Sequence, residues 1–237
     1  SSDVCSSDLF IFDEILKVMA KKKEITNQDI LGFYIDYFLE NNKAPHSVYK
    51  FAKQYNFEEA VFYANFSSFE QIEKTFFTSL FQQTMSLLEK SGDFESYDAR
   101  TKLLSFYFTY FEMLTANRSF VVALLKEDRN KLKSLSKLTE LRKHFKQFFD
   151  TLEIEKIDLK QEKLIEFQEK TMSEMAWLQF LFTLKFWIED TSLSFEKTDI
   201  FIEKSVNTSF DLIDIAPLKS LIDFGKFMWQ EKASFKM

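Results

Sequence analysis

The sequence predicts an all-α fold, and its scarcity of turn-forming residues is the first reason. Glycine and proline number only 3 and 2 in 237 residues, whereas average usage would give roughly 17 and 12. Apolar residues recur at the three- and four-residue spacing of a helix face in most segments. The few helix breakers also stand where helices are expected to end or begin, at Pro45, Gly92 and Pro217. A many-stranded sandwich or an α/β fold would need more turn residues, so both classes are excluded.

Composition also limits the function. The chain has 2 histidines and a single cysteine, Cys5, which lies in the suspect N-terminal segment, so neither a zinc cluster nor a disulfide is expected. Its 3 glycines cannot form a phosphate-binding loop, and no G-x-S-x-G motif occurs. We therefore expect no enzymatic activity and no cofactor. The net charge of −6 suits a cytoplasmic protein. The most apolar run, residues 176–188, is too short and too polar to span a membrane.

The N-terminal segment is expected to be a non-native leader. Its opening, SSDVCSSDL, resembles a translated sequencing adapter, so residues 1–18 are left out of the functional reasoning. A basic arm, Lys21–Lys23, precedes the first expected helix, which runs from its N-cap Thr26 to Asn41. Helical spacing predicts the buried stripe of this helix: Ile30, Phe33, Tyr34, Tyr37 and Phe38.

The segment Ser47–Glu70 predicts two short helices joined by a tight turn. Ser47 can cap the first helix, whose apolar residues recur at helical spacing: Val48, Phe51, Ala52 and Tyr55. Asn56 follows where a helix-turn-helix needs a residue with positive φ, which asparagine tolerates. The second helix begins with Glu58 and Glu59 and buries Phe62 and Phe66.

This segment resembles the DNA-binding head of the TetR family of bacterial repressors. The resemblance rests on the order apolar-Tyr-x-x-Phe-x-Ser-x-Glu from Phe62 to Glu70, together with the preceding helix and turn. It implies a three-helix head at residues 19–68 and a helical C-terminal domain at residues 69–237 that begins with a long connector helix. It further implies a homodimeric transcriptional regulator whose C-terminal domain binds an apolar or lipid-like small molecule.

The resemblance also indicates which residues would contact DNA. In such a head the second motif helix enters the major groove, and its neighbours contact phosphates. The implied contacts are His46, Ser47, Lys50, Tyr63 and Asn65. The Lys21–Lys23 arm would add contacts to the DNA backbone.

The connector helix is expected at Phe69–Lys90, and Ser91–Asp93 ends it. Further helices are expected near residues 98–126, 130–152, 159–190, 195–213 and 217–232. Ser105–Leu125 is apolar almost all round, which predicts a central helix that is buried on several sides. Asn117 and Arg118 interrupt this run, and they either satisfy buried carbonyls or anchor an acidic group of a ligand.

Phenylalanine is unusually frequent, with 30 residues. An aromatic core could leave irregular space for a flat or chain-like ligand, although a composition bias of the source organism would explain the count equally well. The expected ligand contacts are Phe108, Phe111, Asn117, Arg118 and Trp177. The helices at 159–190 and 195–213 have more large apolar residues than one helix pair can cover, so we expect a second copy to pack on them.

Charge leaves two interpretations of the head open. Between Glu24 and Thr75, eight acidic residues face four basic ones, and the second motif helix has Glu58 and Glu59 but no cation. Carboxylates disfavour contact with phosphates, and Phe69 replaces a lysine common in the family. The second interpretation is therefore a relative that does not bind DNA, similar to the lipid-binding accessory proteins of quinone biosynthesis. Its amphipathic last helix would be Leu218–Lys232, which could equally pack on its own domain.

Overall fold

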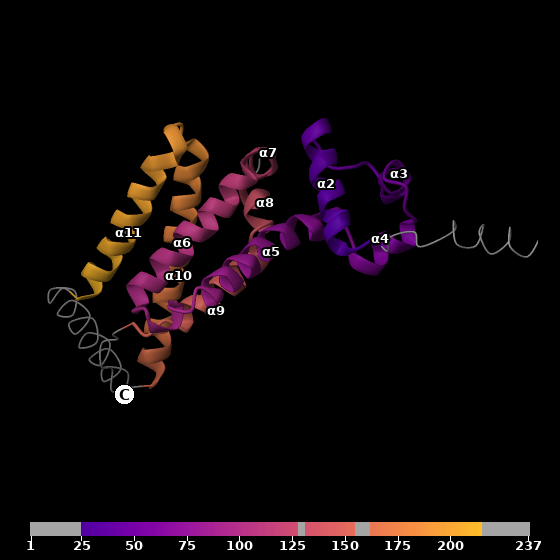
Figure 1. Cartoon of the computed structure of the whole chain (residues 1–237). Coiled ribbons are helices and arrows are strands. Elements are labelled where there is room, and N and C mark those ends of the chain that lie inside the picture. The colour runs from indigo at the N-terminus through magenta and orange to yellow at the C-terminus, as the bar shows by residue number, and fades with distance from the viewer. Residues whose placement is uncertain (1–24, 128–130, 155–161, 215–237) are drawn as a thin grey trace, which may run out of the picture. The chain divides into compact units, whose positions relative to one another are not determined.

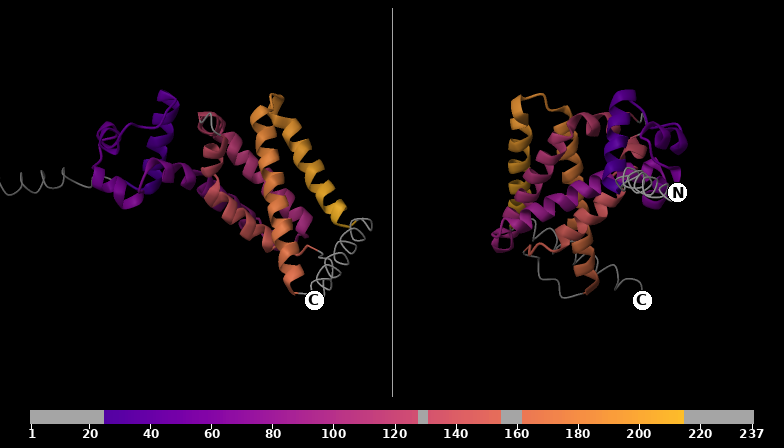
Figure 2. Two further views of the ribbon diagram at one scale, coloured as in Figure 1. Left: turned by 180° about the vertical axis from the view of Figure 1, so that it is seen from behind. Right: turned by 45° about the vertical axis from the view of Figure 1, so that its right-hand side comes forward.

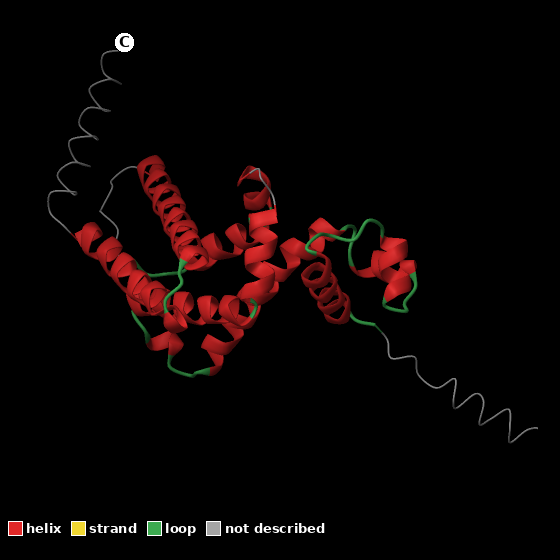
Figure 3. Ribbon diagram, turned by 90° about the horizontal axis from the view of Figure 1, so that it is seen from above, coloured by secondary structure: helices red, strands yellow, loops and turns green. Residues whose placement is uncertain are grey.

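A computed structural model describes residues 25–127, 131–154 and 162–214. All regular elements in these ranges are helices (Figure 3), which confirms the predicted all-α class. The chain divides into two compact units, with the boundary between Ile72 and Glu73. The expected leader, the Lys21–Lys23 arm and the helix expected at 217–232 lie outside the described residues.

The first unit contains α2 (Asn27–Asn41), α3 (Val48–Gln54), α4 (Glu59–Asn65) and the first turn of α5 (Phe69–Lys90) (Figure 1). These helices begin and end where the sequence predicted, and the caps explain why. The hydroxyl of Thr26 accepts a hydrogen bond from the Asp29 amide (3.2 Å), and the Asp29 carboxylate accepts one from the Thr26 amide (2.9 Å). This reciprocal pair satisfies two amides that the helix itself leaves unpaired.

The helix-turn-helix geometry is also present. Ser47 Oγ accepts a hydrogen bond from the Lys50 amide (3.3 Å), so Ser47 caps α3. Asn56 has a φ of 56°, the left-handed conformation that the turn between α3 and α4 requires. The two helices pack against each other. The sequence therefore predicted the local geometry of this motif correctly.

Aromatic rings form the core of the first unit, with Phe51 at its centre. Its side chain is fully buried. Six aromatic rings lie with their centroids 5.1–6.5 Å from its own: Tyr34, Tyr37, Tyr55, Phe57, Phe62 and Phe69. Because these rings come from α2, α3, α4 and the start of α5, the cluster fixes the relative positions of the helices in this unit.

The second unit contains the rest of α5 and the helices that follow it. These are η1 (Phe94–Ser96), α6 (Ala99–Ala116), α7 (Arg118–Glu127), α8 (Lys131–Ser136), α9 (Thr139–Asp150), α10 (Glu162–Glu189), η2 (Leu193–Phe195) and α11 (Glu196–Asp214). The long helices α10 and α11 form an antiparallel hairpin, with α9 packed on α10 and α6 packed on α11 (Figures 1 and 2). None of the helices in the described ranges is long and apolar enough to cross a membrane.

Two helices that we expected to be continuous are broken. The helix expected at 98–126 is interrupted at Asn117, whose amide donates to the Leu114 carbonyl (3.1 Å) instead of continuing the α-helical pattern. The helix expected at 130–152 consists of α8 and α9. At both breaks a long cationic side chain contacts distant elements: Arg118 contacts α10, and Lys137 contacts α5 and α7. The apolar periodicity of a single segment does not depend on such long-range contacts, so it could not predict these two breaks.

Candidate functional site

The α3 and α4 helices present the residues that were predicted to contact DNA. His46, Lys50 and Asn65 are exposed, and Tyr63 is 56% exposed. Ser47 is half-buried, and its hydroxyl caps α3. The side-chain amide of Asn65 donates to the Val61 carbonyl (2.9 Å), so one of its donors is already used within α4.

Two further residues of α3 belong to this candidate surface, although neither is among the residues predicted to contact DNA. Tyr49 is 60% exposed, and Lys53 is also exposed. Both lie off the buried stripe that Phe51 and Ala52 define on the same helix. That stripe was the signal that could have identified them, because residues outside it must face solvent.

Charge is unevenly distributed over the first unit. Residues 25–72 contain three lysines and six carboxylates. Two of the lysines, Lys50 and Lys53, lie on α3, whereas exposed Glu58 and Glu59 stand at the start of α4, which has no cation among Glu59–Asn65. A phosphate backbone would therefore be attracted to α3 and repelled by the start of α4.

The residues predicted to contact a ligand are distributed between core and surface. Phe111 and Trp177 are buried, 3% and 6% exposed. The structure brings them together against Phe180, with centroid distances of 5.8 and 5.1 Å. Phe108 is 39% exposed instead.

Two hydroxyl groups in the described core lack a hydrogen-bond partner. They are Tyr107 Oη and Ser173 Oγ. The Tyr107 ring lies 6.0 Å from the rings of Phe180 and Phe111, so Tyr107 belongs to the same aromatic cluster as Phe111 and Trp177. Burial raises the pKa of the Tyr107 hydroxyl, which therefore stays neutral and can donate a hydrogen bond.

Asn117 and Arg118 make structural contacts. Asn117 Nδ2 donates to the Met113 carbonyl (3.0 Å). The Arg118 guanidinium donates to three carbonyls at the end of α10: Trp187 (2.8 Å), Ile188 (3.2 Å) and Asp190 (3.1 Å). It also lies 4.5 Å from the Trp187 ring centroid and 4.3 Å from that of Phe195. Burial lowers the Arg118 pKa and nearby Asp190 raises it. These contacts match the first of the two interpretations, in which the pair satisfies carbonyls.

Asp190 organises the turn between α10 and α11. Its carboxylate accepts hydrogen bonds from the amide and hydroxyl of Ser192 (2.8 and 2.7 Å) and of Thr198 (3.0 and 2.7 Å). Burial alone would raise the Asp190 pKa, but these bonds hold the pKa at about 2, below the usual 3.8. Ser194 and Phe195 within this turn have positive φ, 51° and 60°, a strained conformation for such residues.

Asp190→Asn is expected to lower the free energy of unfolding by about 2 kcal/mol at neutral pH. This is the free energy that corresponds to the lowering of the Asp190 pKa from 3.8 to about 2. Because the folded-state pKa is depressed, the stabilisation is fully present above about pH 4 and is lost as the pH falls towards 2. Urea unfolding of both proteins across this range should show the difference shrinking as acid is added. Asp93→Asn is the matched control, since Asp93 caps η1 without a side-chain hydrogen bond. If the difference in unfolding free energy between the two proteins did not vary with pH, the stabilisation would not come from the ionised Asp190 carboxylate.

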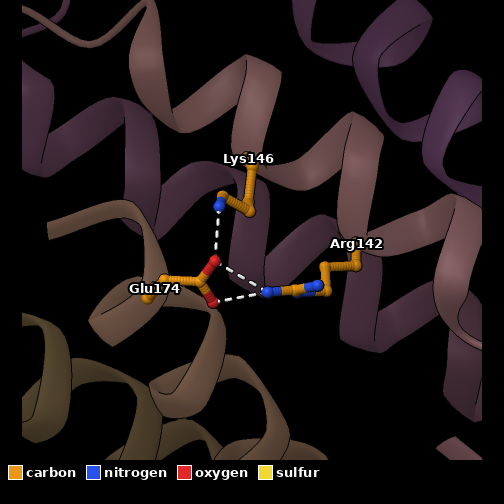
Figure 4. A network of polar contacts seen from close by, with 3 residues as sticks. All are labelled: Arg142, Lys146 and Glu174. Carbon is orange, nitrogen blue, oxygen red and sulfur yellow. Dashed lines mark hydrogen bonds and ion pairs between the residues drawn. The ribbon is translucent and has the colours of Figure 1, made fainter. Parts of the chain in front are cut away.

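Ionic contacts link several helices of the second unit. Glu174 of α10 accepts hydrogen bonds from Arg142 (2.6 and 2.7 Å) and Lys146 (2.7 Å) of α9 (Figure 4). These bonds, Lys146 first, lower the Glu174 pKa, but the side chains are partly exposed, so the network contributes little to stability. Lys137 Nζ and Glu73 Oε2 instead form a buried pair at 3.2 Å, with side chains only 8% and 6% exposed.

The α10–α11 hairpin has an exposed apolar face. Met175, Leu178 and Phe182 of α10 are 63%, 47% and 63% exposed. Beside them lies an open groove of about 550 Å³, lined by Phe186, Lys197, Ile200, Phe201, Lys204, Ser205 and Thr208. None of the residues predicted to contact a ligand lines this groove. The described residues contain no cluster of His, Cys, Asp and Glu that could hold a metal ion.

Comparison with known families covers the second unit. Residues 102–228 match the profile of a family described as "Tetracyclin repressor-like, C-terminal domain". This match spans more than half of the chain and includes α7–α11. No curated protein matches the chain.

Proposed function

Because the chain belongs to the tetracyclin repressor-like (TetR) family, we propose that it is a dimeric transcriptional regulator. Its helix-turn-helix binds DNA, and its C-terminal domain binds an apolar effector. The observation that supports DNA binding most directly is the α3–α4 surface, where Lys50 and Tyr63 are exposed on two packed helices. Such a regulator needs a DNA-binding helix-turn-helix and a C-terminal domain. The α3–α4 motif supports the first, and the family match at residues 102–228 supports the second.

The second unit supports the effector and dimer parts of the proposal. Phe111 and Trp177 share a buried aromatic cluster with Phe180, and the Tyr107 hydroxyl at its edge lacks a partner. An apolar effector with one polar group would satisfy that hydroxyl. The exposed apolar residues of α10 and α11 support a homodimer, because a second copy would remove them from water.

Tyr63→Ala is expected to weaken DNA binding roughly five- to tenfold, as expected for one lost phosphate contact. Fluorescence anisotropy with DNA from the upstream region of the gene would measure the affinity at several salt concentrations. Because tyrosine is neutral, its loss should leave the salt dependence unchanged, whereas Lys50→Ala should reduce the logarithmic slope by about one. Tyr97→Ala is the control, since Tyr97 is partly exposed in the second unit. Unchanged affinity of Tyr63→Ala would exclude this docking mode.

The acidic start of α4 supports a second candidate, a lipid-binding relative whose head does not bind DNA. Glu58 and Glu59 are both exposed there. For this candidate, the same titration should show no preference of the wild type for upstream DNA over unrelated DNA. Replacing both glutamates by lysine should then create non-specific binding, through counterion release. For a working regulator, the same change should abolish an existing preference.

A further inference from the structure

We propose that the effector of this protein is an uncharged, largely apolar molecule with a carbonyl oxygen, and that the hydroxyl groups of Tyr107 and Ser173 recognise this oxygen. This inference rests on the effector site of the proposed function, and it adds the chemical class of the effector and its polar contacts. Two observations carry it: a pair of buried hydroxyl groups without a partner, and surroundings that are aromatic and uncharged.

The hydroxyl groups of Tyr107 and Ser173 are buried and unsatisfied in the described part of the chain. Tyr107 is fully buried, and Ser173 is 1% exposed. Buried polar groups in folded proteins nearly always have a hydrogen-bond partner, because an unsatisfied group costs free energy. Tyr110, on the same helix as Tyr107, follows this rule, since its hydroxyl donates to the Phe77 carbonyl (3.2 Å). The two exceptions therefore indicate a group that binds there.

Tyr107 and Ser173 belong to the facing sides of α6 and α10, which run in the same direction. Trp187 Nε1 of α10 donates to Thr115 Oγ1 of α6 (3.0 Å), and about two turns earlier on both helices the Tyr107 and Phe180 rings lie 6.0 Å apart. Ser173 precedes Phe180 by seven residues, which places both on one face of α10. A tyrosine side chain points towards the start of its helix, so the Tyr107 hydroxyl is directed towards the end of the two helices at which Ser173 lies.

Aromatic rings form the surroundings of these hydroxyl groups. Trp177 follows Ser173 by one turn of α10 and stacks on Phe180, with centroids 5.1 Å apart. The Phe145 ring of α9 lies 6.3, 5.8 and 5.2 Å from the rings of Tyr107, Trp177 and Phe180. A molecule that reaches the two hydroxyl groups must therefore be apolar over most of its surface.

The buried charges of the described residues are engaged elsewhere. They are Glu73 and Lys137, which pair with each other, and Asp190, which accepts hydrogen bonds in the turn after α10. None of them belongs to the aromatic cluster. A carboxylate or an ammonium group placed among these rings would lose its hydration without gaining an opposite charge. The polar group of the effector is therefore uncharged.

A carbonyl oxygen satisfies both hydroxyl groups and leaves no other polar group unpaired. Each hydroxyl needs an acceptor for its hydrogen, and a carbonyl oxygen accepts two hydrogen bonds while having no hydrogen of its own. A water molecule in the same place would bring two further hydrogens, for which the surrounding rings offer no acceptor. Ketones and esters are the uncharged apolar molecules that meet these conditions.

Three naphthalene probes of similar size test this class. Isothermal titration calorimetry with 2-acetylnaphthalene, 2-ethylnaphthalene and 2-naphthoate measures their affinities for the full chain. The ketone should bind at least about fivefold more tightly than the hydrocarbon and than the carboxylate, because only the ketone offers an uncharged acceptor. Tyr107→Phe and Ser173→Ala should each weaken ketone binding roughly three- to tenfold and leave hydrocarbon binding unchanged. Tyr97→Phe, at a partly exposed position, is the matched control and should change neither affinity.

The possible failures of this experiment have different meanings. If none of the probes binds at about 1 mM, the effector site of the proposed function is wrong, and this inference is wrong with it. If the probes bind but the hydrocarbon or the carboxylate matches the ketone, only the carbonyl assignment is wrong. Unchanged ketone affinity of both Tyr107→Phe and Ser173→Ala would likewise contradict only the two contacts.

Thermal unfolding without a probe provides a second test. Tyr107→Phe removes a hydroxyl that no protein group satisfies, so its melting temperature should equal or exceed that of the wild type. Addition of 2-acetylnaphthalene should then raise the melting temperature of the wild type more than that of Tyr107→Phe. A lower melting temperature of Tyr107→Phe without the probe would show that the hydroxyl already has a partner in the free protein, such as a buried water molecule, and would overturn the inference.

Discussion

Lys137→Ala is expected to lower the free energy of unfolding by about 3–5 kcal/mol, because it removes one partner of a buried ion pair. The Lys137 ammonium lies 3.2 Å from a Glu73 carboxylate oxygen, and both side chains are more than nine-tenths buried. The same ammonium donates to the Leu124 carbonyl (3.2 Å). Truncation therefore removes contacts to α5 and α7 at once and takes from the Glu73 carboxylate the ammonium group that lies 3.2 Å away.

Urea unfolding followed by the fluorescence of Trp177 and Trp187, both buried in the second unit, would measure this loss. Lys143→Ala is the matched control, because Lys143 pairs with Glu140 while both side chains are largely exposed (63% and 44%). That variant should cost less than about 1 kcal/mol. The paired change Glu73→Gln with Lys137→Met should be milder than Lys137→Ala, since it leaves no buried charge. If Lys137→Ala and Lys143→Ala lowered the free energy of unfolding equally, the buried Lys137–Glu73 pair would contribute no more than an exposed pair, which would contradict this prediction.

Phe51→Ala is expected to destabilise the first unit by about 3–5 kcal/mol, the usual cost of deleting a buried aromatic side chain. Phe51 is fully buried, and the rings around it come from every helix of that unit. The cavity would separate α2 from α3 and α4, so the whole unit should open more often.

Hydrogen exchange resolved by segment would detect this effect. Amides of α2 and α3 should exchange faster in Phe51→Ala, while those of α6 and α10 should keep their protection if the two units unfold independently. Tyr49→Ala is the control on the same helix, because Tyr49 is 60% exposed; its cost should stay below about 1 kcal/mol. Unchanged exchange in α2 and α3 of Phe51→Ala would refute the central position of this ring.

The sequence was informative wherever the cause of a structure is local. The capping box at Thr26, the cap at Ser47 and the left-handed Asn56 each depend on side chains within a few residues, so the type of residue predicts the backbone. The extent of α5 was predicted for the same reason. These elements include the whole helix-turn-helix.

Features that depend on distant partners were not predictable. The break at Asn117 and Arg118 reflects contacts to α10, which lies about seventy residues further along the chain. The buried Glu73–Lys137 pair and the groove beside Phe186 likewise exist only once the helices pack. Of the expected ligand contacts, the buried Phe111 and Trp177 lie in one aromatic cluster, but Phe108 is partly exposed, and an apolar pattern alone does not separate these cases.

The contacts of Arg118 have a mechanical consequence. The Arg118 guanidinium donates hydrogen bonds to three carbonyls at the end of α10 and lies over the rings of Trp187 and Phe195. The backbone of Arg118 begins α7, directly after the break that ends α6. The guanidinium therefore joins the α6–α7 junction to the end of α10. Any movement of α6 and α7 relative to the end of α10, including rotation, would have to break hydrogen bonds of the Arg118 guanidinium.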